Sequence, residues 1–70
     1  MSEHIEELIR RFEELADLER QASLLYQKLV PYVSDNKDKE TLQAVIEDEN
    51  RHAKMARNAI EILRKETPST

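Results

Sequence analysis

Apolar residues recur through the first half of the chain at alternating intervals of three and four. The series runs Ile5, Leu8, Phe12, Leu15, Glu19, Ala22, Tyr26, Leu29 and Val33. This spacing predicts a helix over about residues 3–32 with a coiled-coil type of apolar stripe, which Ile9, Ala16 and Val30 widen. Glu19 is the charged position within the series. Pro31 has no backbone N–H, so we expect it to kink or end the helix within about a turn.

A second apolar series predicts a second helix over about residues 36–65. The intervening segment Ser34–Asp38 carries turn and capping residues. We expect Asp35 to be the N-cap, with Ser34 and Asp38 as alternatives. The second series comprises Leu42, Val45 or Ile46, Glu49, His52 or Ala53, Ala56, Ile60 and Leu63. Residues 66–70 lack periodicity and are expected to fray.

Two long helices with a short connection predict an all-α, antiparallel hairpin in a single domain over residues 1–70. Glu19 lies fifteen residues before Ser34, and Glu49 lies fifteen residues after it. At ~1.5 Å per residue, both carboxylates are expected roughly 22 Å from the turn. Two acidic residues therefore interrupt two apolar stripes at one level of the hairpin.

The composition narrows the possible functions. The 70 residues include no cysteine, which excludes disulfides, iron–sulfur clusters and thiolate zinc sites. The net charge of −4 is spread along the chain, and three aromatic residues offer no platform for stacking bases, so no nucleic acid is expected. No apolar run is long enough for a membrane span and no signal peptide is recognisable, which predicts a soluble, cytoplasmic protein. A chain this short rarely gains more than ~3–5 kcal/mol from its own core, which favours metal binding, oligomerisation or both.

The residues Glu49-Asn50-Arg51-His52 form an E-x-x-H motif. Positions three apart on a helix share a face, so the carboxylate and the imidazole can bind one metal ion. A two-fold dimer of hairpins would double the set of Glu19, Glu49 and His52 inside a four-helix bundle. Four glutamates and two histidines are the ligands of a ferritin-like di-iron carboxylate site. Iron or manganese suits these ligands, and zinc is an occupant without redox activity.

The chain resembles the encapsulated ferritins, rubrerythrin-related single-hairpin proteins of the ferritin-like superfamily. The resemblance covers about Leu15 to Leu63 and includes Glu19, Ala22 and Tyr26 in the first helix. In the second helix it rests on Asp48-Glu49-Asn50-Arg51-His52-Ala53-Lys54-Met55. At two positions beside Glu19 where that family carries acidic residues, this chain has Leu18 and Gln21.

The resemblance implies a ferroxidase that oxidises Fe(II) to Fe(III), for iron storage or detoxification, at a di-iron site shared between two subunits. Glu19, Glu49 and His52 would be the ligands, and Tyr26 would lie near the site. It also implies a ring of dimers, typically a decamer, delivered to an encapsulin nanocompartment. A rubrerythrin-like peroxide scavenger is an alternative. In a further alternative the chain is a non-catalytic helical oligomerisation module, with Glu19 reaching solvent and Glu49–His52 a surface pair.

Overall fold

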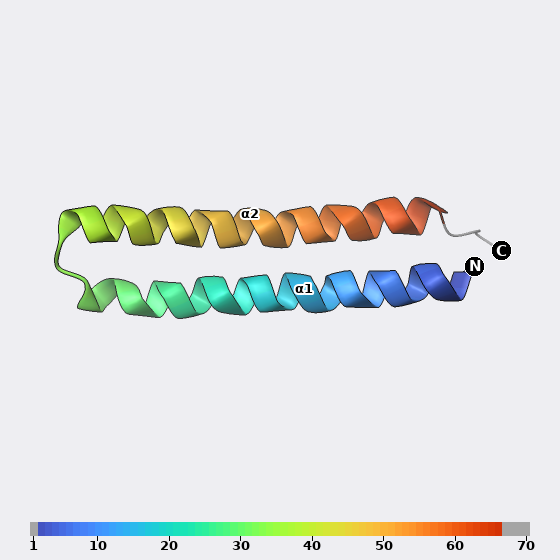
Figure 1. Cartoon of the computed structure of the whole chain (residues 1–70), viewed down its shortest axis with the longest axis horizontal. Coiled ribbons are helices and arrows are strands. Elements are labelled where there is room, and N and C mark those ends of the chain that lie inside the picture. Colours follow the sequence, from blue (N-terminus) through green and yellow to red (C-terminus); the bar gives the residue numbers. More distant parts are fainter. Residues whose placement is uncertain (1, 67–70) are drawn as a thin grey trace.

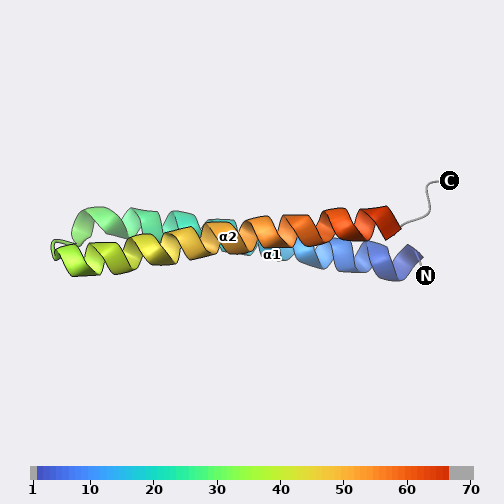
Figure 2. The same ribbon diagram turned by 90° about the horizontal axis from the view of Figure 1, so that it is seen from above.

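The computed structural model describes residues 2–66, which form two long helices packed side by side (Figure 1). Helix α1 spans Ser2–Leu29, the short 3-10 helix η1 spans Val30–Tyr32, and helix α2 spans Asn36–Glu66. The start of α1 and the end of α2 lie at the same end of the molecule, and the view from above shows the helices crossing at a shallow angle (Figure 2). The predicted all-helical antiparallel hairpin is confirmed. Neither helix, within the described residues, is long and apolar enough to cross a membrane.

The connection between the helices follows from proline and capping chemistry. Pro31 lies at the start of η1, and the α-helical part of the first segment ends at Leu29, about one turn before the predicted end at residue 32. The backbone is then extended at Val33. The Asp35 Oδ1 atom accepts a hydrogen bond of 3.0 Å from the Asp38 N–H, which confirms Asp35 as the N-cap of α2.

The far end of α2 differs slightly from the prediction. Glu66 was expected to begin a frayed tail, but it is the last residue of the helix. The remainder of the predicted tail, residues 67–70, lies outside the described residues.

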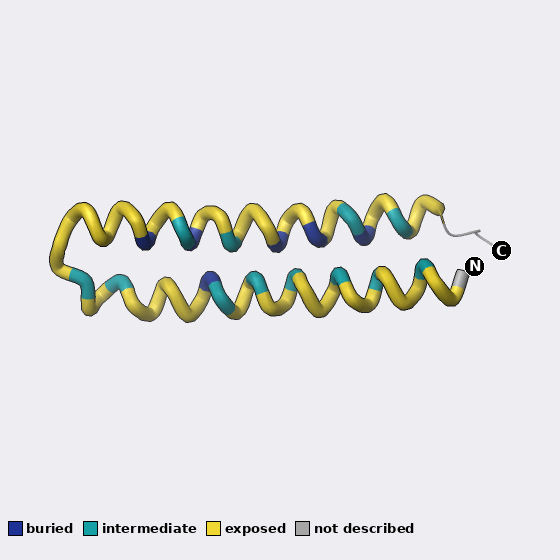
Figure 3. Tube along the Cα trace, viewed as in Figure 1, coloured by how far each residue is buried: buried dark blue, intermediate teal, exposed yellow. Residues whose placement is uncertain are grey.

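The interior of the hairpin is formed mainly by one row of side chains on α2. The buried apolar residues of the described chain all belong to this row, and they are Leu42, Ile46, Ala53, Ala56 and Ile60. On α1 the apolar residues turned toward α2 reach only intermediate burial, among them Ile5, Ile9 and Phe12. Figure 3 shows the buried and half-buried positions along the facing sides of the two helices. Two helices alone therefore enclose a thin core.

A second row of apolar side chains remains open to solvent. On α1, Leu8 and Leu15 are each 42% exposed. Their spacing of seven residues places them on one stripe of the helix, and Leu29 continues it two heptads after Leu15. On α2, Met55 and Ile62 are also exposed and share this seven-residue spacing. We call these five residues, together with Tyr26, the apolar face.

The three-and-four series of α1 therefore combines two faces. Ile5 and Phe12 belong to the half-buried side that packs on α2, whereas Leu8 and Leu15 belong to the apolar face. An apolar stripe this wide is more than a single neighbouring helix can cover. The hairpin therefore covers only one side of the α1 stripe.

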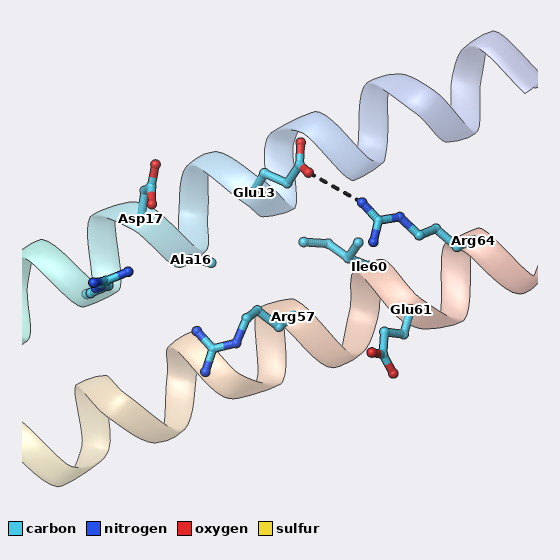
Figure 4. A pocket seen from close by; sticks show the side chains of 8 residues that line it. Glu13, Ala16, Asp17, Arg57, Ile60, Glu61 and Arg64 are labelled. Atoms are coloured by element: carbon cyan, nitrogen blue, oxygen red, sulfur yellow. Dashed lines mark ion pairs between the residues drawn. The ribbon is translucent and has the colours of Figure 1, made fainter.

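The opposite side of the hairpin is charged. Its groove is lined by Glu13, Ala16, Asp17, Arg20, Arg57, Ile60, Glu61 and Arg64. Figure 4 shows Arg64 reaching across from α2 toward Glu13, and the two charged groups lie 3.6 Å apart. Both side chains are more than half exposed, so this ion pair contributes at most about 1 kcal/mol to the hairpin. Three arginines and three acidic residues balance one another along the groove, which gives it no net attraction for an anion or a cation.

Candidate metal centre

Glu19, Glu49 and His52 meet near the middle of the hairpin. Each offers one ligand atom, and these atoms all lie within 4.8 Å of one another. The His52 Nδ1 atom is 3.5 Å from Glu19 Oε2 and 3.4 Å from Glu49 Oε1. The predicted matching height of the two carboxylates on α1 and α2 is thus confirmed. Their role as metal ligands remains a prediction.

The two carboxylates are largely shielded from water. Each glutamate side chain is 21% exposed, whereas that of His52 is 51% exposed. The Oε2 atom of Glu19 is buried and has no hydrogen-bond partner among the described residues. A buried carboxylate oxygen without a hydrogen bond is unfavourable, because it loses hydration and the His52 imidazole 3.5 Å away compensates only in part. A cation bound between the three residues would supply the missing partner.

The proximity of the carboxylates raises the pKa of Glu19. The main cause is the neighbouring Glu49 carboxyl group, because hydrogen bonding between the two side chains favours the protonated form of Glu19. Burial and the negative charge of Glu49 act in the same direction, while His52 opposes them. Without a metal ion, Glu19 therefore holds a proton more readily than an ordinary glutamate. A divalent cation would compete with that proton.

The spacing of the three residues fits a metal ion. Ligand atoms at ~2.1 Å from one ion, separated by angles of about 90–110°, lie roughly 3.0–3.4 Å from each other. The distances from His52 Nδ1 are 3.4 Å to Glu49, at the upper end of this range, and 3.5 Å to Glu19, just above it, so the ligand atoms would move inward to hold an ion. Two carboxylate oxygens and one imidazole nitrogen suit iron, manganese or zinc. One hairpin supplies three ligand residues, which leaves coordination positions open.

The open side of this cluster leads onto the apolar face. A groove beside Glu19 and His52 is lined by the apolar residues Phe12, Leu15, Met55 and Ala56. A second hairpin covering the apolar face would therefore also cover the open side of the three ligand residues.

Tyr26, predicted to lie near the site, is placed on the apolar face, 37% exposed. It is seven residues after Glu19, which corresponds to about 10 Å along α1. Within one hairpin the structure does not bring Tyr26 into the cluster of Glu19, Glu49 and His52.

A polar cluster beside the site was not anticipated from the sequence. Ser23 is 1% exposed, and its hydroxyl donates a hydrogen bond of 2.8 Å to Asn50 Oδ1. The Gln27 side-chain amide donates in turn to Ser23 Oγ, at 3.1 Å. One feature of the sequence could have indicated this cluster: Ser23 is a polar residue within the apolar stripe, one helical turn after Glu19.

Comparison of the chain with family models, with curated proteins and with solved structures gives no match. The assignment of function therefore depends on the geometry of the site.

Proposed function

We propose that this protein oxidises Fe(II) to Fe(III) at a di-iron site assembled from Glu19, Glu49 and His52 of two hairpins. The observation that carries the proposal is the meeting of two carboxylates and an imidazole from both helices, with the Glu19 Oε2 atom buried and unpartnered. Charged side chains whose only role is to be solvated have no reason to bring two carboxylates and an imidazole together. The resemblance to the encapsulated ferritins supports the same activity.

Pairing of two hairpins is supported by the surface that a single hairpin leaves exposed. The chain exposes 5895 Å², whereas a compact protein of its 8.3 kDa mass exposes roughly 4,600 Å². The apolar face accounts for part of this excess, and apolar patches of this kind mark contact surfaces. A two-fold contact through that face brings two sets of three ligand residues toward each other.

In the proposed reaction the iron ions are substrates. Each Fe(II) loses one electron, and dioxygen takes up two electrons and two protons to give hydrogen peroxide. The carboxylates of Glu19 and Glu49 would bind the ions and offset the added positive charge of Fe(III), and His52 would hold one ion through its imidazole nitrogen. The apolar lining from Phe12 and Leu15 would limit access of bulk water to the site.

The test is oxidation of Fe(II) in air, followed by near-ultraviolet absorbance. The double variant Glu49→Ala, His52→Ala should lose the protein-dependent oxidation. A matched control, His4→Ala with Glu40→Ala, removes the same residue types from exposed positions and should oxidise iron like the wild type. If the wild type is no faster than the site variant, the ferroxidase proposal is wrong.

A second candidate, a purely structural oligomerisation module, is favoured by the apolar face alone. The two functions differ in their dependence on metal. A metal-bridged dimer should assemble more tightly when Fe(II) or Zn(II) is added, whereas a structural module should associate equally with and without metal. Sedimentation velocity in the presence and absence of zinc distinguishes them.

A further inference from the structure

The buried hydroxyl of Ser23 joins the two helices beside the candidate metal centre. Its hydrogen bond to Asn50 links residues 27 positions apart, from α1 to α2, at a distance of 2.8 Å. Ser23 is 1% exposed and is the only polar side chain in the buried interior of the described chain. Asn50 and Gln27 are both exposed, so each could be hydrated by water if the hydroxyl were absent. Removal of the Ser23 hydroxyl would therefore leave no buried polar group unpaired, so the main effect of the bond is on the geometry of the two helices.

The position of this bond relates it directly to the ligands. Ser23 lies one turn after Glu19 on α1, about 6 Å along the helix axis. Asn50 is the residue that follows Glu49 on α2. A bond between Ser23 and Asn50 therefore connects the helix segment that carries one carboxylate to the segment that carries the other.

Packing fixes the relative height of the helices less firmly on the side of the ligands away from the turn. Ile46 is buried one turn before Glu49, but between Glu49 and Ile60 the buried residues of α2 are only the alanines Ala53 and Ala56. Alanine side chains are short and interlock little with a facing helix, so they resist sliding less than leucine or isoleucine. A hydrogen bond has a preferred length and direction, so it restricts axial sliding of α1 against α2 more than contacts between alanines do.

We propose that Ser23 is a positioning residue: its hydrogen bond to Asn50 holds α1 and α2 in the register at which the carboxylates of Glu19 and Glu49 meet on one metal ion. This inference rests on the proposed metal function. A metal site needs its ligands within about 0.5 Å of their productive geometry, so a small axial shift of one helix is enough to weaken it. Gln27 assists, because its amide donates to Ser23 Oγ and leaves the hydroxyl proton free to point at Asn50.

The first measurement is titration of the full chain with Co(II), a probe whose visible absorption reports ligand geometry. The Ser23→Ala variant removes only the hydroxyl. We expect a shift in helix register to move the ligands apart, so that this variant binds Co(II) about tenfold more weakly, as much as when a hydrogen-bond partner of a ligand is lost, with shifted visible bands. Its urea midpoint should stay close to that of the wild type, because Asn50 and Gln27 can turn to water.

The matched control is Ile60→Val. Ile60 is 6% exposed in the core, eleven residues from Glu49, so its truncation should lower the urea midpoint without changing Co(II) affinity or spectrum. The two variants should therefore show opposite effects, which separates a role in positioning the ligands from a role in the stability of the hairpin. Equal weakening of Co(II) binding by Ile60→Val, or unchanged binding and spectrum in Ser23→Ala, would overturn the inference.

The second measurement needs no metal. Nuclear Overhauser contacts between methyl groups of α1 and α2 in the metal-free protein report the register directly. The wild type should give one set of contacts around Ala22 and Ala53, and Ser23→Ala should give a shifted or second set. Identical contacts in both proteins would refute the positioning role. Failure of the wild type to bind Co(II) above the Glu49→Ala, His52→Ala variant would instead refute the metal function, so the two failures are distinguishable.

Discussion

Leu15 provides a direct test of whether the apolar face is a contact between copies of the chain. It lines the groove beside Glu19 and His52, and 42% of its surface is exposed in the hairpin. Alanine is also a strong helix former, so the substitution should leave the helix intact. It removes most of the apolar side-chain surface that Leu15 itself would contribute to a contact with a second hairpin. The prediction is that Leu15→Ala weakens self-association while the hairpin remains helical.

The magnitude follows from the exposed area. An exposed fraction of 42% corresponds to about 70 Å² of a leucine, or about 1.8 kcal/mol when it is buried at ~25 cal/mol per Å². Alanine retains only its β-carbon, so the loss is about 1.5 kcal/mol per copy. A two-fold dimer contains the substitution twice, which gives about 3 kcal/mol and a dissociation constant about 100-fold higher.

Sedimentation equilibrium on the metal-free protein measures this dissociation constant. The matched control is Leu24→Ala, because Leu24 is similarly exposed, at 49%, but lies four residues after Arg20 and seven after Asp17, which line the opposite, charged groove. Leu24→Ala should leave association within about twofold of the wild type. If Leu15→Ala does not weaken association, or if Leu24→Ala weakens it equally, then the apolar face is not the contact.

The remaining predictions concern stability. Ile46→Ala should lower the free energy of unfolding by about 2–3 kcal/mol in urea, because it truncates a core side chain that is 6% exposed; a loss below about 0.5 kcal/mol would contradict the described core. Asp35→Ala should cost about 1 kcal/mol by removing the cap of α2, and Asp35→Asn should restore most of it. The raised pKa of Glu19 means that the folded protein retains a proton that the unfolded chain releases, so this group's contribution to stability is present at low pH and is lost as the pH rises through the raised pKa. Glu19→Gln should therefore stabilise the metal-free protein at neutral pH, by an amount that shrinks on acidification; a gain independent of pH would refute the raised pKa of Glu19. Zn(II) at 100 times its dissociation constant should raise the unfolding free energy by about 2.7 kcal/mol, and Glu49→Ala should abolish this gain.

The hairpin and the meeting of its two carboxylates follow from local signals in the sequence. Pro31 and the capping carboxylate of Asp35 locate the turn, and the constant rise of a helix then fixes how far Glu19 and Glu49 lie from it. Because both residues interrupt apolar stripes, the sequence also predicts that they face the neighbouring helix. Height and facing direction together were enough to place them beside each other.

The division of the α1 stripe between two faces could not be obtained in the same way. Steps of three and four residues describe a wide apolar band, and nothing in the spacing says that Phe12 packs on α2 while Leu15 is left exposed. That outcome depends on the crossing of the helices. Ser23 was missed for a related reason: a serine in a helix can bond to a backbone carbonyl one turn earlier, so its position does not reveal a partner such as Asn50, 27 residues away.

The thin core has a consequence for how the amount of protein is controlled in a cell. No apolar residue described on α1 is fully buried within its own hairpin. If a second copy covers the apolar face, stability depends on concentration, and newly made chains remain open to proteases until they meet. The concentration of the assembled protein would then rise more than in proportion to the rate of synthesis. Unassembled copies, which hold half of the ligands, would be degraded before they could expose Fe(II) to dioxygen at an incomplete site.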